Sequence, residues 1–230
     1  LLFIDILMIT QPGCLCRYCV ESMTEQRLDP ESDSDIEKNS VSVAREFMKG
    51  IAGMLKKLGK KDMRVFYNSR LRVCADVSAG SIPELKKYYT IVEIESLPSG
   101  GWGYDHFPFF SRYFTERGLD VMSHTGRFHT VWGDFGGLKN KEALEYECFR
   151  MLANGVKCSI GDQLHPSGKI NKTTYNLVGS VYSQVKKVEE FAFPSKSIND
   201  IGVLVCESMK NTDQNPESNY GAMRMLMESQ

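Results

Sequence analysis

The stretch IVEIESLPSGGWGYDHFP, residues 91–108, decides how this sequence is interpreted. It starts with apolar residues over the length of a strand, continues with carboxylates, and runs into a loop of glycines, aromatic residues and one histidine. A second loop of similar composition follows at residues 125–137, TGRFHTVWGDFGG. Acids at the C-terminal end of a strand, beside rings that can stack on a sugar, are typical of a carbohydrate-cleaving site. Two such loops after successive strands predict one face of a (β/α) barrel.

Composition excludes several classes of protein. The chain has 230 residues, of which 42% are hydrophobic and 25% charged, with a net charge of −1, as expected of a globular protein with a core. It has no basic stripe that would indicate nucleic acid, and no apolar run of the roughly 18 residues that a membrane helix needs. Its seven cysteines, several in apolar segments, predict reduced thiols and a cytoplasmic location. Because the sequence starts within an apolar run and stops within a helical pattern, we expect a fragment of a longer protein.

Strand and helix patterns alternate along the chain, which predicts an α/β protein with a parallel sheet and helices outside it. A complete (β/α)₈ barrel needs about 250 residues, so residues 1–194 are interpreted as its C-terminal part. A polar linker, a buried strand at 201–206 and a helix from about 219 predict the start of a second α/β domain at 195–230. The predicted strands are 2–9, 64–68, 88–95, 120–124 and 156–161, and the predicted helices are 34–58, 108–117, 141–154 and 172–188.

Three acids are candidate catalytic residues. Glu93 and Glu95 are two positions apart on a strand, so their side chains point to the same side, and Glu95 is nearer the C-terminal rim. Buried acids are costly unless they are paired or used, and pairing with an arginine such as Arg127 is the structural alternative. Asp5 lies in an apolar strand, where it is either a nucleophile facing Glu95 or a structural cap.

The two loops also supply candidate substrate-binding residues. Aromatic side chains in glycine-rich loops can stack on a sugar, although simple loop packing explains them equally well. Histidines that follow strand ends can donate hydrogen bonds to sugar hydroxyls, but a lone loop histidine is more often only solvated. Asp162, at a strand end, can contact substrate or hold a loop, and Arg127 can pair with Asp134 to support the site. The candidates are Trp102, Tyr104 and Trp132, then His106, His129 and His165, then Arg127 and Asp162.

A cysteine cluster, CLCRYC at residues 14–19, has the spacing C-x-C-x-x-C. The thiolates of Cys14, Cys16 and Cys19 can supply three of the four tetrahedral ligands of a structural zinc ion. From the spacing alone, three free thiols in a loop are an equally good interpretation. No cofactor for catalysis is expected.

Several long motifs resemble a known family of barrel enzymes. The segments EIESLPSGGWGYDHFP (93–108), TGRFH (125–129), WGDFGGLKN (132–140) and SIGDQLHP (159–166) resemble the glycosyl hydrolase 6 group, which is similar to the family 151 alpha-L-fucosidases. The resemblance implies a glycosidase barrel followed by a flavodoxin-like, beta-galactosidase trimerisation-like domain that starts near residue 197. It therefore also implies a homo-oligomer for the full-length protein.

The same resemblance implies roles for the cysteines and for Asp5. Beta-galactosidases of family 42 carry a similar C-x-C-x-x-C after the fourth barrel strand, where it binds zinc with one earlier cysteine. The strand that contains Asp5 is then the fourth. Family 42 has an Asn-Glu pair there, whereas this chain has Ile4-Asp5, which is similar to the nucleophile placement of family 29 alpha-L-fucosidases.

These observations predict a glycoside hydrolase that acts on terminal sugars of an oligosaccharide or glycoside. The predicted mechanism is retaining, with Asp5 as nucleophile and Glu95 or Glu93 as acid/base, and the predicted substrate is an alpha-L-fucoside. A beta-galactosidase is the alternative within the same class. A carbohydrate-binding barrel without catalysis, or an inactive fragment, is the alternative outside it.

Overall fold

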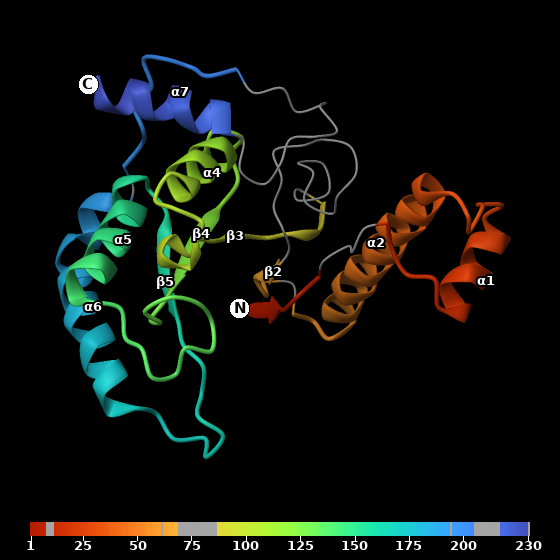
Figure 1. Ribbon diagram of the computed structural model, residues 1–230, viewed down its shortest axis with the longest axis horizontal. Helices are drawn as coiled ribbons and strands as arrows, with labels where there is room; N and C mark the ends of the chain where they lie inside the picture. The colour runs from red at the N-terminus through yellow and green to blue at the C-terminus, as the bar shows by residue number, and fades with distance from the viewer. Residues whose placement is uncertain (8–11, 61, 69–86, 194, 205–216, 230) are drawn as a thin grey trace. The chain divides into compact units, whose positions relative to one another are not determined.

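The computed structural model describes residues 1–7, 12–60, 62–68, 87–193, 195–204 and 217–229 (Figure 1). These residues form two compact units, and the boundary between them falls between Val92 and Glu93. Each unit contains a small sheet with helices beside it, so the chain is a mixed α/β protein. Among the described residues, no helix combines the length and apolar character needed to cross a membrane.

The first unit contains a pair of parallel strands, β1 (Leu2–Ile4) and β2 (Val65–Tyr67). The helices α1 (Arg17–Glu25) and α2 (Asp33–Lys57) lie between them in the sequence. Parallel strands need a long crossover, and these helices supply it. β2 is buried along its whole length, as its apolar sequence predicts.

The structure revises the predicted helices of this unit. Helix α1 lies where the sequence predicted only cysteines and a loop. α2 starts after Ser32 rather than at Ser34, and no side chain caps it, although Ser34 and Glu37 have the spacing of a capping box. The apolar side chains with helical spacing that would form one buried stripe of α2 are partly exposed, Phe47 among them. The buried face instead includes Asn39, whose amide oxygen accepts hydrogen bonds from Ser22 and Gln26 of α1.

The second unit contains β3 (Val92–Glu95), β4 (Val121–Gly126) and β5 (Lys157–Gly161), in the order β3-β4-β5. β4 and β5 are parallel. The predicted strands at 88–95, 120–124 and 156–161 are therefore confirmed, with β3 shorter than predicted. Whether the strands of both units close into one barrel stays a prediction.

Helices surround this sheet. A 3₁₀ turn, η1 (Pro98–Gly100), leads from β3 to α4 (His106–Thr115), and α5 (Lys141–Ala153) leads into β5. The side chain of Asn140 caps α5 by accepting from the backbone N–H of Ala143 at 2.8 Å.

Two further helices complete the unit. α6 (Lys172–Ala192) packs along α5, and α7 (Glu217–Glu228) lies beside α4 (Figure 1). Tyr220 of α7 stacks edge-on against Phe109 of α4, with ring centroids 5.0 Å apart.

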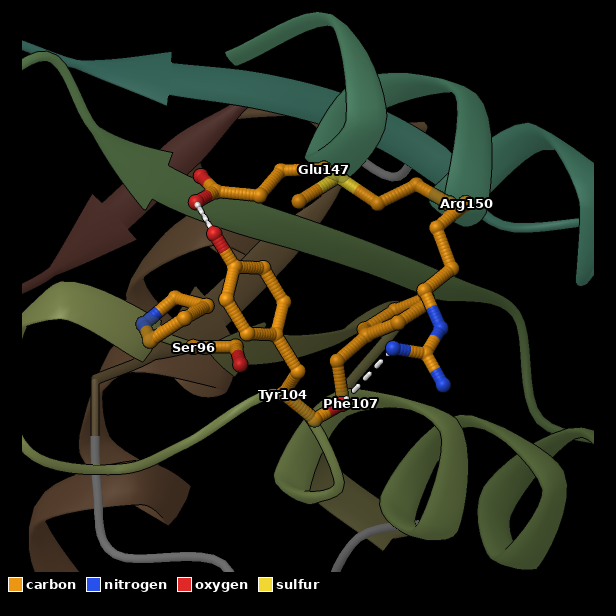
Figure 2. A pocket seen from close by; sticks show the side chains of 7 residues that line it. Ser96, Tyr104, Phe107, Glu147 and Arg150 are labelled. Atoms are coloured by element: carbon orange, nitrogen blue, oxygen red, sulfur yellow. Dashed lines mark hydrogen bonds between the residues drawn. The ribbon is translucent and has the colours of Figure 1, made fainter. Parts of the chain in front are cut away.

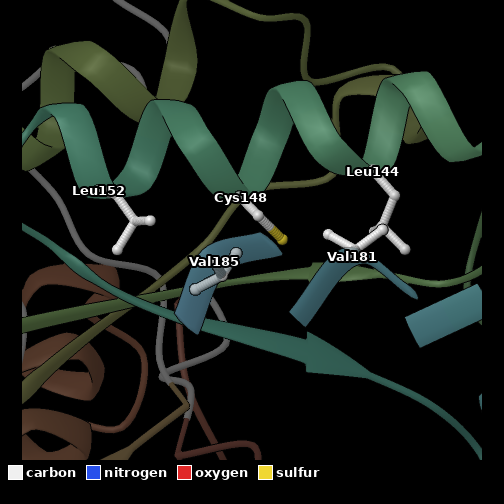
Figure 3. Close-up of a cluster of buried hydrophobic side chains, with 5 residues drawn as sticks. All are labelled: Leu144, Cys148, Leu152, Val181 and Val185. Carbon is white, nitrogen blue, oxygen red and sulfur yellow. The ribbon is translucent and has the colours of Figure 1, made fainter. Parts of the chain in front are cut away.

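The core between α5 and α6 follows the helical periodicity of the sequence. Three side chains of α5 and two of α6 form a buried cluster (Figure 3), and Cys158 and Ile160 of β5 pack against it. Tyr175, predicted to face inward, is exposed instead. The five clustered residues are Leu144, Cys148, Leu152, Val181 and Val185.

The segment after residue 194 departs from its prediction. Residues 201–204 form no strand in the described part of the chain, and Leu204 is 96% exposed, whereas a buried strand was predicted at 201–206. Residues 205 and 206 lie outside the described residues. An apolar segment becomes a buried strand only where another strand pairs with it, and the sequence does not show whether such a partner exists. The predicted domain boundary stays a prediction.

We expect the Leu144→Ala substitution to lower the free energy of unfolding by about 2–5 kcal/mol, because it leaves a cavity in the α5–α6 core. Urea titration followed by circular dichroism measures the effect. Leu164→Ala is the matched control: Leu164 is exposed, so its removal should change stability by less than about 0.5 kcal/mol. Equal effects of the two substitutions would contradict the assignment of the core.

Candidate active site

Asp5 was predicted within a strand at 2–9, but β1 ends at Ile4, so Asp5 follows directly after it; residues 8 and 9 lie outside the described residues. Asn68 follows directly after the parallel strand β2. Their side chains meet, because Asn68 Nδ2 donates to Asp5 Oδ1 at 3.0 Å. The carboxylate is exposed and lies at the C-terminal edge of this strand pair, where functional groups of parallel sheets gather. The next residue, Ile6, has a φ of +54°, which a β-branched residue rarely adopts. Such backbone strain is concentrated at functional sites.

Glu93 and Glu95 extend from the same side of β3, as the strand alternation predicts, and both approach His124 of the neighbouring strand β4. The carboxylate of Glu93 is buried and hydrogen-bonded to His124 Nδ1. Glu95 Oε1 lies 3.7 Å from His124 Nε2. The sequence interpretation placed an arginine as the alternative partner of these acids, and the structure places a histidine there instead.

Trp132 belongs to the second loop and contacts the carboxylate of Glu95. Its indole Nε1 donates to Glu95 Oε1 at 2.6 Å, and its ring packs edge-on against Phe128, with centroids 5.0 Å apart. The C-terminal residue of β5, Gly161, makes room for the indole. A Cβ atom at that position would stand 2.3 Å from the indole ring, so any other residue would displace Trp132.

Arg127 is buried and supports the loop that carries Trp132. Its Nε donates to Asp162 Oδ1 at 2.8 Å, and its Nη1 donates to the carbonyl of Gly137 at the same distance. The backbone N–H of Lys139 donates to the carbonyl of Arg127 at 2.8 Å. Residues 127–139 are thus closed at their base and joined to the loop after β5.

A buried ionic network lies on the other face of β4. Lys139 Nζ donates to Glu147 Oε2 at 2.6 Å and to Thr125 Oγ1 at 2.8 Å. Thr125 Oγ1 donates to Glu147 Oε2 at 2.6 Å. Because Glu147 belongs to α5, Thr125 faces that helix, and the adjacent His124 faces away from it. Glu93 and Glu95 therefore point away from the helical layer.

Tyr104 lines a hollow between the turn after β3, α4 and α5 (Figure 2). Its hydroxyl donates to Glu147 Oε1 at 3.4 Å, and its carbonyl accepts from Arg150 at 3.0 Å. Burial raises the pKa of Tyr104, so it remains a neutral donor at physiological pH. The ring itself is partly exposed at the rim of the hollow.

The predicted histidines differ in burial. His106, predicted in a loop, is the buried first residue of α4; its Nδ1 lies 3.3 Å from Ser96 Oγ, and its ring contacts Trp102. Burial lowers the pKa of His106 to about 4. His129 and His165 are exposed, and His165 Nδ1 lies 2.9 Å from Ser167 Oγ within its own loop.

The structure therefore brings together part of the predicted set. His124 contacts both Glu93 and Glu95, and Trp132 contacts Glu95. Arg127 contacts Asp162. Asp5 belongs to the other unit. Sequence reasoning missed His124, which it treated as the last residue of a strand. The sequence offered only the polar residues at the end of this strand as a signal, because the pairing of β4 with β3 is known only from the structure.

The cysteine cluster lies where α1 begins. Cys16 is the N-cap residue of α1, and the ligand atoms of Cys14, Cys16 and Cys19 lie within 4.8 Å of one another. A hydrogen bond from the backbone of Cys19 lowers the pKa of the Cys16 thiol, whereas burial raises the pKa of Cys19 to about 11. Gly13, with φ +149°, lets the chain pass α2, because a Cβ there would stand 2.1 Å from Ser40 Oγ.

Comparison with known proteins agrees with this architecture. No known family's sequence profile matches the chain, and no curated protein matches it. Among solved structures, the chain is similar to "Alpha-L-fucosidase isoenzyme 2 from Paenibacillus thiaminolyticus", with 33% sequence identity and a TM-score of 0.83. The similarity covers 96% of this chain and 33% of that protein, so the chain spans about a third of its length. The fold is therefore similar to part of a fucosidase structure.

We expect stability to fall as the pH decreases from about 6.5 to about 4. The pKa of His106 is lower in the folded state than in the unfolded chain, so its contribution is complete above the unfolded pKa of 6.5 and is lost as the folded pKa of about 4 is approached. The difference corresponds to about 3 kcal/mol. Thermal unfolding of the wild type and of His106→Phe across this range measures it, and the variant should lack this part of the pH dependence. His165→Phe, which alters an exposed histidine, should keep it.

Proposed function

We propose that this chain is part of a retaining glycoside hydrolase that cleaves terminal alpha-L-fucosyl residues. The observation that carries the proposal is Glu95, a carboxylate at the C-terminal end of β3 that is held by the indole of Trp132, in a chain similar to a fucosidase. Acids at strand ends beside aromatic rings are the groups that glycoside hydrolysis requires. The likeness to a fucosidase favours an alpha-L-fucoside over a beta-galactoside.

Glu95 is assigned as the acid/base. Its Oε1 is fixed by Trp132, so Oε2 is the oxygen that exchanges a proton with the substrate. In the first step Glu95 gives its proton to the glycosidic oxygen as the bond to the anomeric carbon breaks. In the second step it takes a proton from the water that releases the sugar. Glu93 is buried against His124 and supports this pair rather than contacting the sugar.

Asp5 is assigned as the nucleophile. Its exposed carboxylate is oriented by Asn68 and followed by the strained backbone of Ile6. It attacks the anomeric carbon and forms a covalent glycosyl ester, which water then hydrolyses. In retaining glycosidases the nucleophile and the acid/base lie about 5–5.5 Å apart.

Trp132 is the best supported of the proposed sugar-binding residues, because it touches the acid/base and is partly exposed. Trp102 is proposed to stack on the sugar from the other loop, and the exposed His129 and His165 to donate hydrogen bonds. Tyr104, whose hydroxyl donates to Glu147, and the buried His106 are proposed to support the loop after β3 instead of donating to the sugar. Arg127 and Asp162 act by holding the Trp132 loop in place.

The cysteine cluster is proposed to bind a structural zinc ion. Tetrahedral coordination with Zn–S bonds of about 2.3 Å places sulfur atoms about 3.8 Å apart, and the three sulfur atoms here are already within 4.8 Å of one another. The group contains three ligands among the described residues, so a fourth must come from elsewhere in the full-length protein. When bound, the ion would join the start of α1 to the segment that follows β1.

We expect Asp5→Gly to lower kcat on 4-nitrophenyl alpha-L-fucoside by about 10³-fold or more, because the nucleophile is lost. Sodium azide should restore turnover and yield the fucosyl azide of inverted anomeric configuration, since azide then attacks once in place of the carboxylate. Glu95→Gly should give the azide of retained configuration, because azide then intercepts the covalent intermediate.

Product configuration, determined by proton NMR, distinguishes the two roles. Asp200→Gly removes an exposed acid that has no proposed role in the site and should leave kcat unchanged. Unchanged activity of Asp5→Gly would refute the nucleophile. Faster hydrolysis of 4-nitrophenyl beta-D-galactoside would refute the fucosidase assignment, and calorimetric binding of fucose without turnover would identify a non-catalytic binding barrel.

We expect one zinc ion per chain after purification without chelators, and less than half of it in the Cys16→Ser variant, because zinc binds the thiolate. Elemental analysis by mass spectrometry measures the stoichiometry. Cys158→Ala alters a cysteine outside the cluster and should keep the full zinc content. Equal zinc in the two variants, or none in the wild type, would rule out the site.

A further inference from the structure

We infer that His124 is a positioning residue for the acid/base, held by Glu93 so that its second ring nitrogen faces Glu95. The inference rests on the proposed function and deepens it, because it gives the two neighbouring carboxylates different roles. Glu93 is the permanent hydrogen-bond acceptor of the pair, and Glu95 is the residue that exchanges a proton with substrate.

The backbone fixes His124 against the end of β3. The carbonyl of His124 accepts from the backbone N–H of Ser96 at 2.9 Å. On the preceding residue, Ser123 Oγ donates to the carbonyl of Ile94 at 2.7 Å. Because residues on both sides of Glu95 are tied to this part of β4, the imidazole has little freedom to move relative to the two carboxylates.

The contacts of the imidazole distinguish its two nitrogens. Nδ1 is hydrogen-bonded to the buried carboxylate of Glu93, and Nε2 lies 3.7 Å from Glu95 Oε1. The Glu93 carboxylate accepts a hydrogen bond from Nδ1–H, which keeps the neutral ring in the Nδ1–H tautomer, so Nε2 carries no proton and faces Glu95 with its lone pair. The side chains are mostly buried, with exposed fractions of 2% for Glu93, 12% for His124 and 16% for Glu95.

This geometry argues against a metal site at the same three residues. A cation would require the two carboxylates and one ring nitrogen to converge on a single point. Here the carboxylates contact opposite nitrogens of the ring, so the imidazole separates them. Two like charges on one strand face would otherwise repel each other, and an intervening N–H donor stabilises the charge of Glu93.

Trp132 completes the arrangement from the other side. Its Nε1 donates to the same Oε1 atom of Glu95 that His124 approaches, and its ring lies edge-on to the imidazole, with centroids 5.8 Å apart. The indole N–H therefore holds this oxygen, and the imidazole, packed against the indole, limits where the indole can lie. The orientation of the other oxygen toward substrate then depends on both rings.

The decisive variant is His124→Asn. The asparagine amide places an N–H donor near the position of Nδ1, so the bond to Glu93 and the fold should be kept, but nothing replaces Nε2. We expect kcat on 4-nitrophenyl alpha-L-fucoside to fall about 10- to 100-fold, with KM changed by less than about 3-fold. The double variant His124→Asn/Glu93→Gln should lose little more activity than the worse single variant, because the two residues act as a unit.

Met122→Leu is the control, since it conserves volume on the same strand and should keep wild-type kinetics. A merely structural histidine predicts that a folded His124→Asn retains wild-type kcat, and that result would overturn the inference. Unfolding of the variant, seen by circular dichroism, would leave the decision to the spectroscopic measurement on the wild type.

That measurement is ¹⁵N NMR of histidine-labelled wild-type protein near neutral pH. We expect His124 to carry its proton on Nδ1 and not on Nε2, and Glu93→Gln to abolish this preference. An Nε2–H tautomer in an active wild type would overturn the inference while leaving the proposed function intact. A folded, full-length wild type that hydrolyses no alpha-L-fucoside would refute the proposed function, and with it the kinetic role of His124.

Discussion

The buried ion pair between Lys139 and Glu147 is the constraint on which the site in the second unit depends. Both side chains are almost inaccessible to water, so each charge is tolerated only because the other is beside it and Thr125 supplies a further hydrogen bond. Removing one partner from such a pair typically costs about 3–5 kcal/mol. The pair joins three parts of the chain: the end of β4, the end of the loop that follows it, and α5. It therefore sets the position of the loop relative to the sheet.

The loop between Arg127 and Lys139 links this buried ion pair to Glu95. Arg127 closes the loop through the carbonyl of Gly137 and joins it to Asp162 beyond β5. Trp132, in the middle of the loop, then reaches Glu95 over the bare backbone of Gly161. Polar contacts on one face of β4 thus determine how an aromatic side chain is presented on the other face. A carboxylate positioned by rigid neighbours rather than by its own flexible side chain is what acid/base chemistry needs.

Much of this arrangement follows from local sequence rules, and the failures have physical reasons. Alternation along a strand predicted that Glu93 and Glu95 share a face, and the helical periodicity of α5 predicted Leu144, Cys148 and Leu152 in a core. The position of His124 could not be predicted, because a strand histidine becomes significant only when the neighbouring strand and its register are known. The same holds for Lys139, whose partner Glu147 follows eight residues later, within α5. Helix α1 was missed because it is short, is mostly polar and begins within the cysteine cluster.

By itself, the sequence determined the alternation of strands and helices, the composition of the loops and the acids at the strand ends, because these depend on the side-chain periods of two and 3.6 residues and on the backbone preferences of glycine. Only the tertiary structure decided which polar groups meet: Glu93 and Glu95 with one imidazole, Trp132 with one carboxylate oxygen, and Arg127 with Asp162 rather than with an acid of β3. The physical reason is that burial makes an unpaired polar group costly. Its partner is selected by what the folded chain brings within hydrogen-bonding distance, and that distance is unrelated to separation along the sequence.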